Sequence, residues 1–309
     1  MSLALQVVVT GLGAGGVYGL VAIGHTLIYR LTGILHFALG DLIGLGVFST
    51  LLVAAGTGAV AQPSVGASRF VVALAVGLAV CAAASAGSYV YAIQPYVTRG
   101  WTLGWAAATV AVAFAIRTTL QAVFSRSAYV FPDPLPFRRI GREGFVTVAG
   151  ASIQVRTFYV IALSIAIAAL ATLTLERTRF GRALQAVAAD AEGARIVGIP
   201  VERYIALAFA AAGAVAAIAA VAAAPSAPFD VGAGTLLGLK GLVAALLVRF
   251  GSPTAAFAAG LFVGVLESAA AGLVVYGHQL GPQWRDVVPL ALALLLLFAR
   301  RPRFAELVE

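Results

Sequence analysis

Residues 204–224 read YIALAFAAAGAVAAIAAVAAA, a run without a single charged side chain. The hydrocarbon core of a bilayer is about 30 Å thick and needs around 20 apolar residues in a helix, which this run supplies. Comparable runs recur at 4–29, 33–56, 70–93, 101–124, 157–175, 232–250, 254–276 and 285–299. Because lipid offers the backbone no hydrogen bonds, such continuous apolar segments must be helices rather than alternating barrel strands. The sequence therefore predicts an all-α, polytopic integral membrane helix bundle of eight spans, with nine as the alternative.

Two regions leave the number of spans open. The run 232–250 carries Lys240, and the glycine-rich stretch 4–56 is interrupted between residues 30 and 40. The second region is either two spans or one span plus a broken helix. No internal repeat is found in the sequence, so residues 1–309 are expected to form one integral membrane domain. Small residues spaced four apart predict closely packed helices, and such pairs occur at glycines 11/15, 15/19, 40/44, 234/238 and 260/264.

The composition excludes several classes of protein. Apolar residues make up 61% of the chain and charged residues 10%, whereas soluble domains carry about 25% charged residues. This excludes a soluble globular enzyme, a disordered chain and a coiled coil. The net charge of +8 resides in arginines between apolar runs, which is typical of cytoplasmic loops rather than of nucleic-acid binding. The lone Cys81 is predicted to be a packing residue. No basic residue precedes Arg30, so the first run is predicted to be a retained membrane segment rather than a secretory signal.

Arginine-rich segments predict the orientation in the membrane. The loop 176–203 reads ERTRFGRALQAVAADAEGARIVGIPVER, and the tail 300–303 reads RRPR. Both are predicted to be cytoplasmic, because loops on that side carry an excess of arginine and lysine. Counting spans backward places the loop 125–156 outside, although it also contains arginines. Its PDPLPF stretch blocks helix formation and predicts an extended, exposed external loop.

The loop 176–203 has the chemistry of a docking element. Between Gly181 and Gly198 its apolar residues recur at helical spacing, which predicts one short amphipathic helix. The charges of the whole loop 176–203 nearly balance: five are basic (Arg177, Arg179, Arg182, Arg195, Arg203) and four are acidic (Glu176, Asp190, Glu192, Glu202). Such a helix either docks in a groove on a soluble partner or lies on lipid headgroups.

Motifs for catalysis and nucleotide binding are missing from the sequence. There is no G-x-x-x-x-G-K-[ST] loop to cradle phosphates, no G-x-S-x-G elbow and no H-E-x-x-H pair. The three histidines, His25, His36 and His278, are far apart in the chain and predict no metal site. We expect no catalytic residues and interpret the apolar bundle as a conduit across the membrane.

The loop also carries a family resemblance. The run GRALQAVAADAEGARIVGI at 181–199 resembles the coupling loop of ABC importer permeases, in the version found in LivH-type permeases for branched-chain amino acids. The resemblance implies that this coupling helix seats in an ATP-binding subunit, with Gly193 where the family usually has alanine. The positions to which it assigns this role are Gly181, Arg182, Asp190, Glu192, Ala194, Arg195 and Gly198.

Further motifs extend the resemblance over most of the chain. The segment 17–48, VYGLVAIGHTLIYRLTGILHFALGDLIGLGVF, is similar to the family's signature near its N-terminus. His36 and Leu39 depart from it, because asparagine and histidine are usual there. The segments LLGLKGLVAALLVRFGSP at 236–253 and GLFVGVLESAAAG at 260–272 resemble two later blocks of the family.

Three charged residues lie within or beside apolar segments: Asp41, Lys240 and Glu267. A charge at the bilayer centre costs about 2.5–3.5 kcal/mol by insertion scales, so these side chains must face the bundle interior, water or one another. In a functional interpretation they line the pathway or pair across a gate. In a structural interpretation they form ion pairs or reach water at the interface. For Lys240 and Glu267 we favour the structural interpretation. For Asp41 both interpretations stay open.

A permease must release its cargo, so its corridor is expected to be only weakly polar. Tyr18, Tyr29, His36, Phe37 and Asp41 offer such a surface for an amino acid with an apolar side chain. The substitutions at His36 and Leu39 lie in the same segment and affect the choice of solute more than the family.

The resemblance implies a permease subunit of an ABC importer for branched-chain or related amino acids in the bacterial inner membrane. It implies four kinds of partner: membrane lipid, a second related permease, two ATP-binding subunits, and a periplasmic or lipid-anchored solute-binding protein. ATP and Mg²⁺ would bind those ATP-binding subunits, and this chain would bind no cofactor. One alternative is a permease of the same family for urea, short amides or another small polar solute. A more distant one is an ion-coupled secondary transporter, which would predict inverted repeats and broken helices. An intramembrane enzyme is disfavoured, because no catalytic constellation is found.

Overall fold

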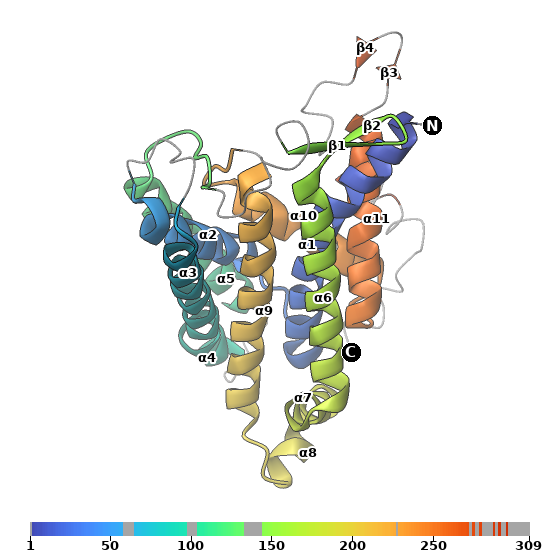
Figure 1. The fold of residues 1–309 in the computed structure, drawn as a ribbon. Helices are drawn as coiled ribbons and strands as arrows, with labels where there is room; N and C mark the ends of the chain where they lie inside the picture. The colour runs from blue at the N-terminus through green and yellow to red at the C-terminus, as the bar shows by residue number, and fades with distance from the viewer. Residues whose placement is uncertain are drawn as a thin grey trace.

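The computed structural model describes residues 2–57, 65–97, 104–132, 144–226 and 228–271, and a few positions beyond them: 274–275, 278–279, 287, 290–291 and 295 (Figure 1). Of the expected span 285–299, the structure describes only residues 287, 290–291 and 295. The arginine tail 300–303 and residues 133–143 of the expected external loop lie outside the described residues.

Helices make up most of the described chain. Six of them are long and apolar enough to cross a membrane. These six regions are α1 (Ser2–Thr32), α3 (Ala67–Gly87) continued by a π-helical segment (Ser88–Ile93) and α4 (Gln94–Val97), α5 (Gly104–Val123), α6 (Val155–Arg177), α9 (Val201–Ala223) continued by a 3₁₀ turn (Ala224–Ser226), and α11 (Pro253–Ala271). Two apolar helices are shorter, α2 (Leu39–Ala55) and α10 (Ala233–Leu247). The prediction of an all-α, polytopic membrane protein is confirmed.

The interruption in the first glycine-rich stretch separates two helices. The hydroxyl of Thr32 accepts a hydrogen bond from the amide of Ile34 (3.2 Å) and donates one to the carbonyl of Ile28 (2.8 Å). Gly33 follows with a φ of +68°, a conformation that ends a helix and that glycine adopts without steric cost. The predicted run 33–56 therefore forms a helix only from Leu39 onward, and α2 is short.

The small elements lie outside the bundle. Strands β1 (Phe145–Val148) and β2 (Ala151–Gln154) pair antiparallel, with Phe145 opposite Gln154. The two turn residues, Ala149 and Gly150, both have positive φ, which suits a tight hairpin turn. This hairpin lies in the segment that the sequence analysis expected to be an extended external loop. Strands β3 (Val274–Val275) and β4 (His278–Gln279) form a second, two-residue pair.

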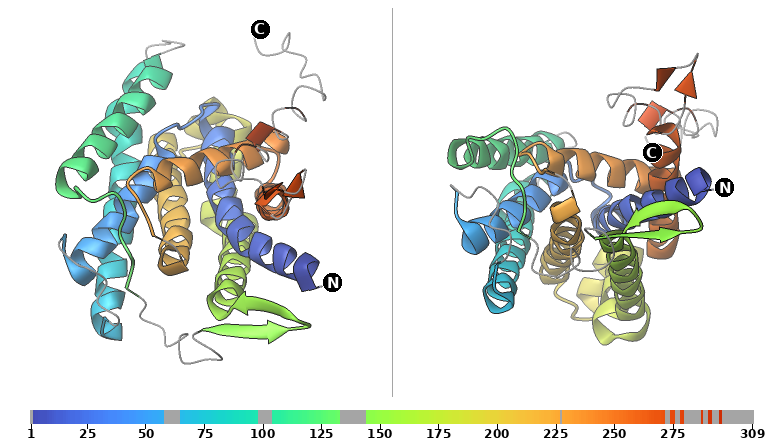
Figure 2. Two further views of the ribbon diagram at one scale, coloured as in Figure 1. Left: turned by 90° about the horizontal axis from the view of Figure 1, so that it is seen from above. Right: turned by 45° about the horizontal axis from the view of Figure 1, so that its top comes forward.

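The first three helices and the last three described helices are arranged alike but run in opposite directions. In Figure 1, α1 and α3 run downward, whereas α9 and α11 run upward. Helix α1 packs against α11, α9 packs in the same way against α3, and the short helices α2 and α10 pack against each other (Figures 1 and 2). The sequence GDLIGL at 40–45 matches GTLLGL at 234–239. The structure thus contains a repeated arrangement of helices that the sequence analysis did not find, because the similar segments are only six residues long.

Glycines bring the two short helices into direct backbone contact. A Cβ atom on Gly238 would lie 2.5 Å from the Cα of Gly40, and one on Gly234 would lie 2.6 Å from the Gly40 carbonyl oxygen. The pair α1 and α11 is equally close, since a Cβ on Gly260 would lie 2.2 Å from the Cα of Gly19. Small residues permit such approaches between helices in lipid, and the predicted close packing at these glycines is confirmed.

Candidate functional site

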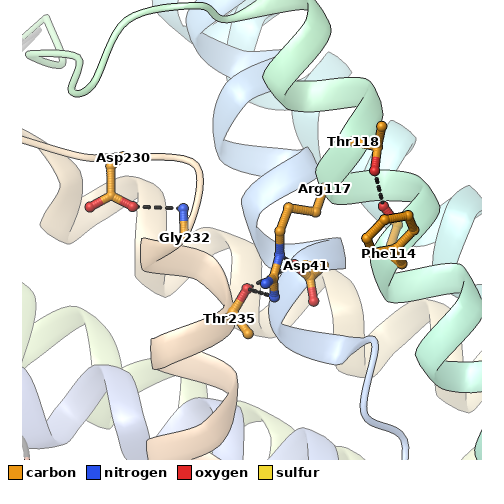
Figure 3. Close-up of polar contacts among 7 residues, drawn as sticks. All are labelled: Asp41, Phe114, Arg117, Thr118, Asp230, Gly232 and Thr235. Carbon is orange, nitrogen blue, oxygen red and sulfur yellow. Dashed lines mark hydrogen bonds and ion pairs between the residues drawn. The ribbon is translucent and has the colours of Figure 1, made fainter.

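Asp41 lies where the short helices cross, in a polar cluster drawn from three helices (Figure 3). One oxygen of its carboxylate, Oδ1, accepts hydrogen bonds from Nε of Arg117 on α5 (3.1 Å) and from the hydroxyl of Thr235 on α10 (2.7 Å). Nη2 of Arg117 donates to the same hydroxyl (2.7 Å), which closes a triangle of polar contacts. The Asp41 side chain is buried, whereas 39% of the Arg117 side chain is exposed.

The sequence analysis missed Arg117 and Thr235. Arg117 interrupts the apolar run 101–124 just as Asp41 interrupts its own run. The same rule that singled out Asp41, a charge inside an apolar segment, was sufficient to find Arg117. Thr235 has no comparable signal, although it occupies the position in the second repeat that Asp41 occupies in the first.

The other two charges form a buried ion pair next to a tyrosine. Nζ of Lys240 lies 2.9 Å from Oε2 of Glu267 and 3.1 Å from the hydroxyl of Tyr18, which donates to the same Oε2 (2.7 Å). All three residues are buried. They join α1, α10 and α11, and the charges compensate each other inside the bundle. Lys240 and Glu267 thus form an ion pair, in line with the structural interpretation favoured in the sequence analysis.

The residues expected to line the corridor do not form one surface. Tyr18 belongs to the buried ion pair, and Tyr29 stacks on Phe250 with ring centres 4.1 Å apart. His36 is almost fully buried, with Nε2 at 3.4 Å from the Ser88 hydroxyl. Phe37 is exposed. Of the five, only Asp41 lies in a polar cluster that includes a partly exposed charge.

The loop after α6 forms two helices rather than the one that was predicted. Helix α7 spans Arg179–Ala189 and α8 spans Ala191–Ile196. They are separated by Asp190, whose extended backbone cannot continue a helix. Its carboxylate instead accepts hydrogen bonds from the amides of Glu192 (3.0 Å) and Gly193 (2.9 Å), which caps the N-terminus of α8.

Two glycines fix the shape of this loop. Gly181 lies so close to the end of α6 that a Cβ would be 2.2 Å from the carbonyl oxygen of Leu175. Gly198 ends α8 with a φ of +86°, and its amide donates to the carbonyl of Arg195 (3.0 Å). Both positions require glycine for a steric reason. Gly193 also avoids a clash, because a Cβ there would lie 2.4 Å from Oδ2 of Asp190.

The α7–α8 segment, defined here as residues 179–197, extends beyond the end of the bundle (Figure 1). Leu184, Val187 and Ala194 are buried, whereas Ile196 and the following residue Val197 are 82% and 76% exposed. Several charged residues are exposed as well, namely Arg182, Asp190, Glu192 and Arg195. Arg195 bonds Glu202 at the start of α9 (2.5 Å), and this pairing raises the pKa of Arg195. The segment thus presents an apolar tip surrounded by charges of both signs.

A cavity of about 140 Å³ lies beside α7. Its walls include Arg30 near the end of α1, Glu176 near the end of α6, Gln185 on α7 and Thr254 at the start of α11. Gln185 also donates to the carbonyl of Leu175 (2.7 Å). Helix α7 is therefore held against the ends of the long helices.

The comparisons with known proteins show the family of the chain. The family model described as "Branched-chain amino acid transport system / permease component" matches residues 7–297. The high-affinity branched-chain amino acid transport system permease protein BraD of Pseudomonas aeruginosa is 28% identical, over 96% of this chain and 94% of its own. The corresponding LivH protein of Salmonella typhimurium is 27% identical, over 95% and 92%. The LivH protein of Escherichia coli strain K12 is also 27% identical. The chain, a multi-pass membrane protein, therefore belongs to the family of permease components of branched-chain amino acid transport systems.

Proposed function

We propose that this chain is a permease subunit of an ABC importer that moves branched-chain or related amino acids across the bacterial inner membrane. The family match over nearly the whole chain supports a permease, and the relatives are named for transport of branched-chain amino acids. The transport energy would come from ATP hydrolysed with Mg²⁺ by separate subunits, since the sequence has no phosphate-binding loop.

The α7–α8 segment is the observation that carries this proposal. It is structured by caps and glycines, extends beyond the bundle, and exposes Ile196 and Val197. Exposed aliphatic side chains surrounded by charges are suited to a groove on a protein partner. In this proposal the segment is the coupling element, and the ATP-binding subunits are its partners in the cytoplasm.

The remaining partners follow from what a single chain leaves uncovered. Helix α5 contributes few buried residues, so one of its faces is available to a second, related permease. A solute-binding protein, periplasmic or lipid-anchored, would deliver the amino acid at the opposite end from the α7–α8 segment. The assembly would then contain two permeases, two ATP-binding subunits and one binding protein.

An ion-coupled secondary transporter would also contain inverted repeats and short helices. The repeat seen here therefore does not separate the two classes, and the proposal rests on the family match and the α7–α8 segment. Transport energetics separate them directly. An ABC importer needs ATP on the cytoplasmic side, whereas a secondary transporter needs an ion gradient.

The test is uptake by the complete complex in proteoliposomes. We expect radiolabelled leucine, isoleucine or valine to accumulate only when ATP is present inside and the binding protein outside. Accumulation driven by a sodium or proton gradient without ATP would contradict the proposal. Preferential uptake of urea or short amides would agree with a permease of an ABC importer but would contradict the proposed solute.

A pair of variants tests the coupling role. Val197→Asp places a charge on the exposed tip, and Val148→Asp makes the same change on the exposed β hairpin. We expect Val197→Asp to lose co-purification with the ATP-binding subunits and Val148→Asp to retain it. Equal co-purification of both variants would remove the coupling role from this tip.

A further inference from the structure

Arg117 is the charged side chain of a helix that is otherwise uncharged and largely unburied. It lies on α5, and Phe114 and Gln121 lie about one turn before and after it, both exposed. The Arg117 side chain is 39% exposed, although its neighbour Asp41 is almost completely buried. An arginine that faces lipid within a membrane span is costly, so this part of α5 must face water, solute or protein.

The hydrogen bonds of Arg117 leave half of its guanidinium open. Nε and Nη2, which share one edge of the planar group, donate to Asp41 and Thr235. No other acceptor is found for this group among the residues that the structure describes. The end of the guanidinium formed by Nη1 and the second hydrogen of Nη2 therefore remains available. This edge matches the geometry of a carboxylate, which accepts two parallel hydrogen bonds from arginine.

The same cluster has an unused acceptor. Oδ2 of Asp41 is buried and accepts no hydrogen bond from any described residue. A buried carboxylate oxygen without a partner is energetically unfavourable, and such a group requires an explanation. An ammonium group would satisfy it. An α-amino acid carries a carboxylate and an ammonium on the same carbon, so its two charges correspond to the open edge of Arg117 and the unsatisfied oxygen of Asp41.

We propose that Arg117 and Asp41 form the subsite that holds the two charged groups of the transported amino acid, with Arg117 on the carboxylate and Asp41 on the ammonium. This inference rests on the proposed function and adds to it a solute-binding site on this subunit. Thr235 is a positioning residue, because its hydroxyl bonds both charged side chains. The apolar side chain of the solute would lie along the exposed face of α5, beside Phe114.

The site lies where the repeats meet. Asp41 belongs to the first turn of α2, and Thr235 belongs to the first turn of α10. The two helices touch through Gly40, Gly234 and Gly238, so the backbone positions of Asp41 and Thr235 are fixed relative to each other. Binding between the N-terminal turns of two short helices at a repeat interface is a geometry suited to small charged solutes.

The test uses a cysteine placed next to the site. Gln121→Cys introduces an exposed thiol one turn from Arg117, and the native Cys81 is buried and therefore does not compete for the reagent. Labelling is measured in the full complex with its second permease and ATP-binding subunits. The probes are an equimolar pool of L-leucine, L-isoleucine and L-valine, their carboxamides, and 4-methylpentanoate, which lacks the ammonium group.

We expect the amino-acid pool to slow labelling, and the carboxamides and 4-methylpentanoate to protect roughly ten- to hundredfold less well, as loss of one charge-assisted contact predicts. Adding Arg117→Gln should abolish the difference between amino acids and carboxamides. Arg126→Gln, which removes an exposed arginine beyond α5, should preserve it. Arg117→Lys keeps the charge without the planar fork and should give intermediate protection.

Three results would overturn the inference: equal protection by the carboxamides, undiminished protection in Arg117→Gln, or a thiol that cannot be labelled in the complex. The last result would mean that the neighbouring permease covers Arg117. Because the comparison of ligands needs only Gln121→Cys, it remains informative if Arg117→Gln fails to assemble. ATP-driven uptake is measured in the same preparation. If uptake is intact and protection fails, only this inference falls; if ATP drives uptake of no amino acid, the proposed function falls.

Discussion

Lys240 and Glu267 form an ion pair inside the helix bundle, with Nζ and Oε2 2.9 Å apart and both side chains at most 5% exposed. Water cannot compensate for the loss of either partner at this depth. Breaking a buried pair by removing one charge costs about 3–5 kcal/mol, whereas removing both charges is often tolerated. The pair therefore holds α10 against α11 only as long as it is complete.

Single and double substitutions separate these effects. We expect Lys240→Met and Glu267→Gln each to lower the thermal unfolding temperature of the purified protein strongly. The double variant should recover a large part of the loss, because no unpaired charge remains. Unfolding monitored in detergent measures this. If the loss of stability in the double variant equals the sum of the losses in the two single variants, the two charges are not energetically coupled.

The crossing of α2 and α10 predicts a contrast between two glycines. Gly238→Ala would place a methyl group 2.5 Å from the Gly40 backbone, whereas Gly44→Ala would place one no closer than 3.8 Å to any atom of another helix. Overpacking of this kind costs about 1–3 kcal/mol. We expect Gly238→Ala to reduce folding yield and thermal stability and Gly44→Ala to leave both nearly unchanged. Similar losses in both variants would show that the crossing is looser than the structure describes.

The cap at Asp190 predicts a difference between alanine and asparagine. Asp190→Ala removes two hydrogen bonds to the start of α8 and should cost about 1 kcal/mol of local stability, whereas asparagine is an equally good N-cap. ATP-driven uptake should therefore fall in Asp190→Ala and persist in Asp190→Asn. Protection of the α8 amides from hydrogen exchange provides a second measurement. Normal protection in the alanine variant would contradict the capping role.

The orientation can be measured with two cysteines. Val197→Cys on the exposed tip should react with a membrane-impermeant reagent only from the cytoplasm. Val148→Cys on the β hairpin should react only from outside, since the two sites lie at opposite ends of the structure (Figure 1). Reaction of Val197→Cys in intact cells would reverse the predicted orientation and remove the basis for coupling.

Charge reversal tests the same segment without altering its apolar tip. Arg182 and Glu192 are exposed, and the structure shows no hydrogen bond from either side chain within the described residues. We expect Arg182→Glu or Glu192→Lys to abolish ATP-driven uptake while membrane insertion is unaffected, because the partner would face the wrong charge. Uptake at the unmodified rate in both variants would show that these charges do not contact the ATP-binding subunits.

The sequence was sufficient to predict the helical class, the glycine contacts and the presence of helical structure in the loop after α6. These features depend on local properties: run length, small-residue spacing and the alternation of charged and apolar positions. The break in the loop at Asp190 was missed, because aspartate is compatible both with a helix surface and with a cap. Ile196, one of the apolar residues of this run, is exposed, whereas Leu184 and Val187 before the break are buried.

The polar contacts depended on long-range pairing and were harder to predict. Lys240 lies 222 residues from Tyr18, and Thr235 lies 194 residues from Asp41. Nothing in the local sequence specifies such partners. The inverted repeat was missed for a related reason, because only six residues around Gly40 and Gly234 remain alike. The five residues expected to form a corridor belong to one continuous segment, yet their side chains point to different neighbours.

The backbone contact between Gly40 and Gly238 has a mechanical consequence for any change of shape. Where side chains separate neighbouring helices, the helices can shift slightly while those side chains change rotamer. Glycines have no rotamers, so this junction offers no such compliance. A displacement that begins at α7, next to the start of α11, and reaches α10 would be passed to α2 almost undamped. The junction is then the point at which the two halves of the chain must move as one body.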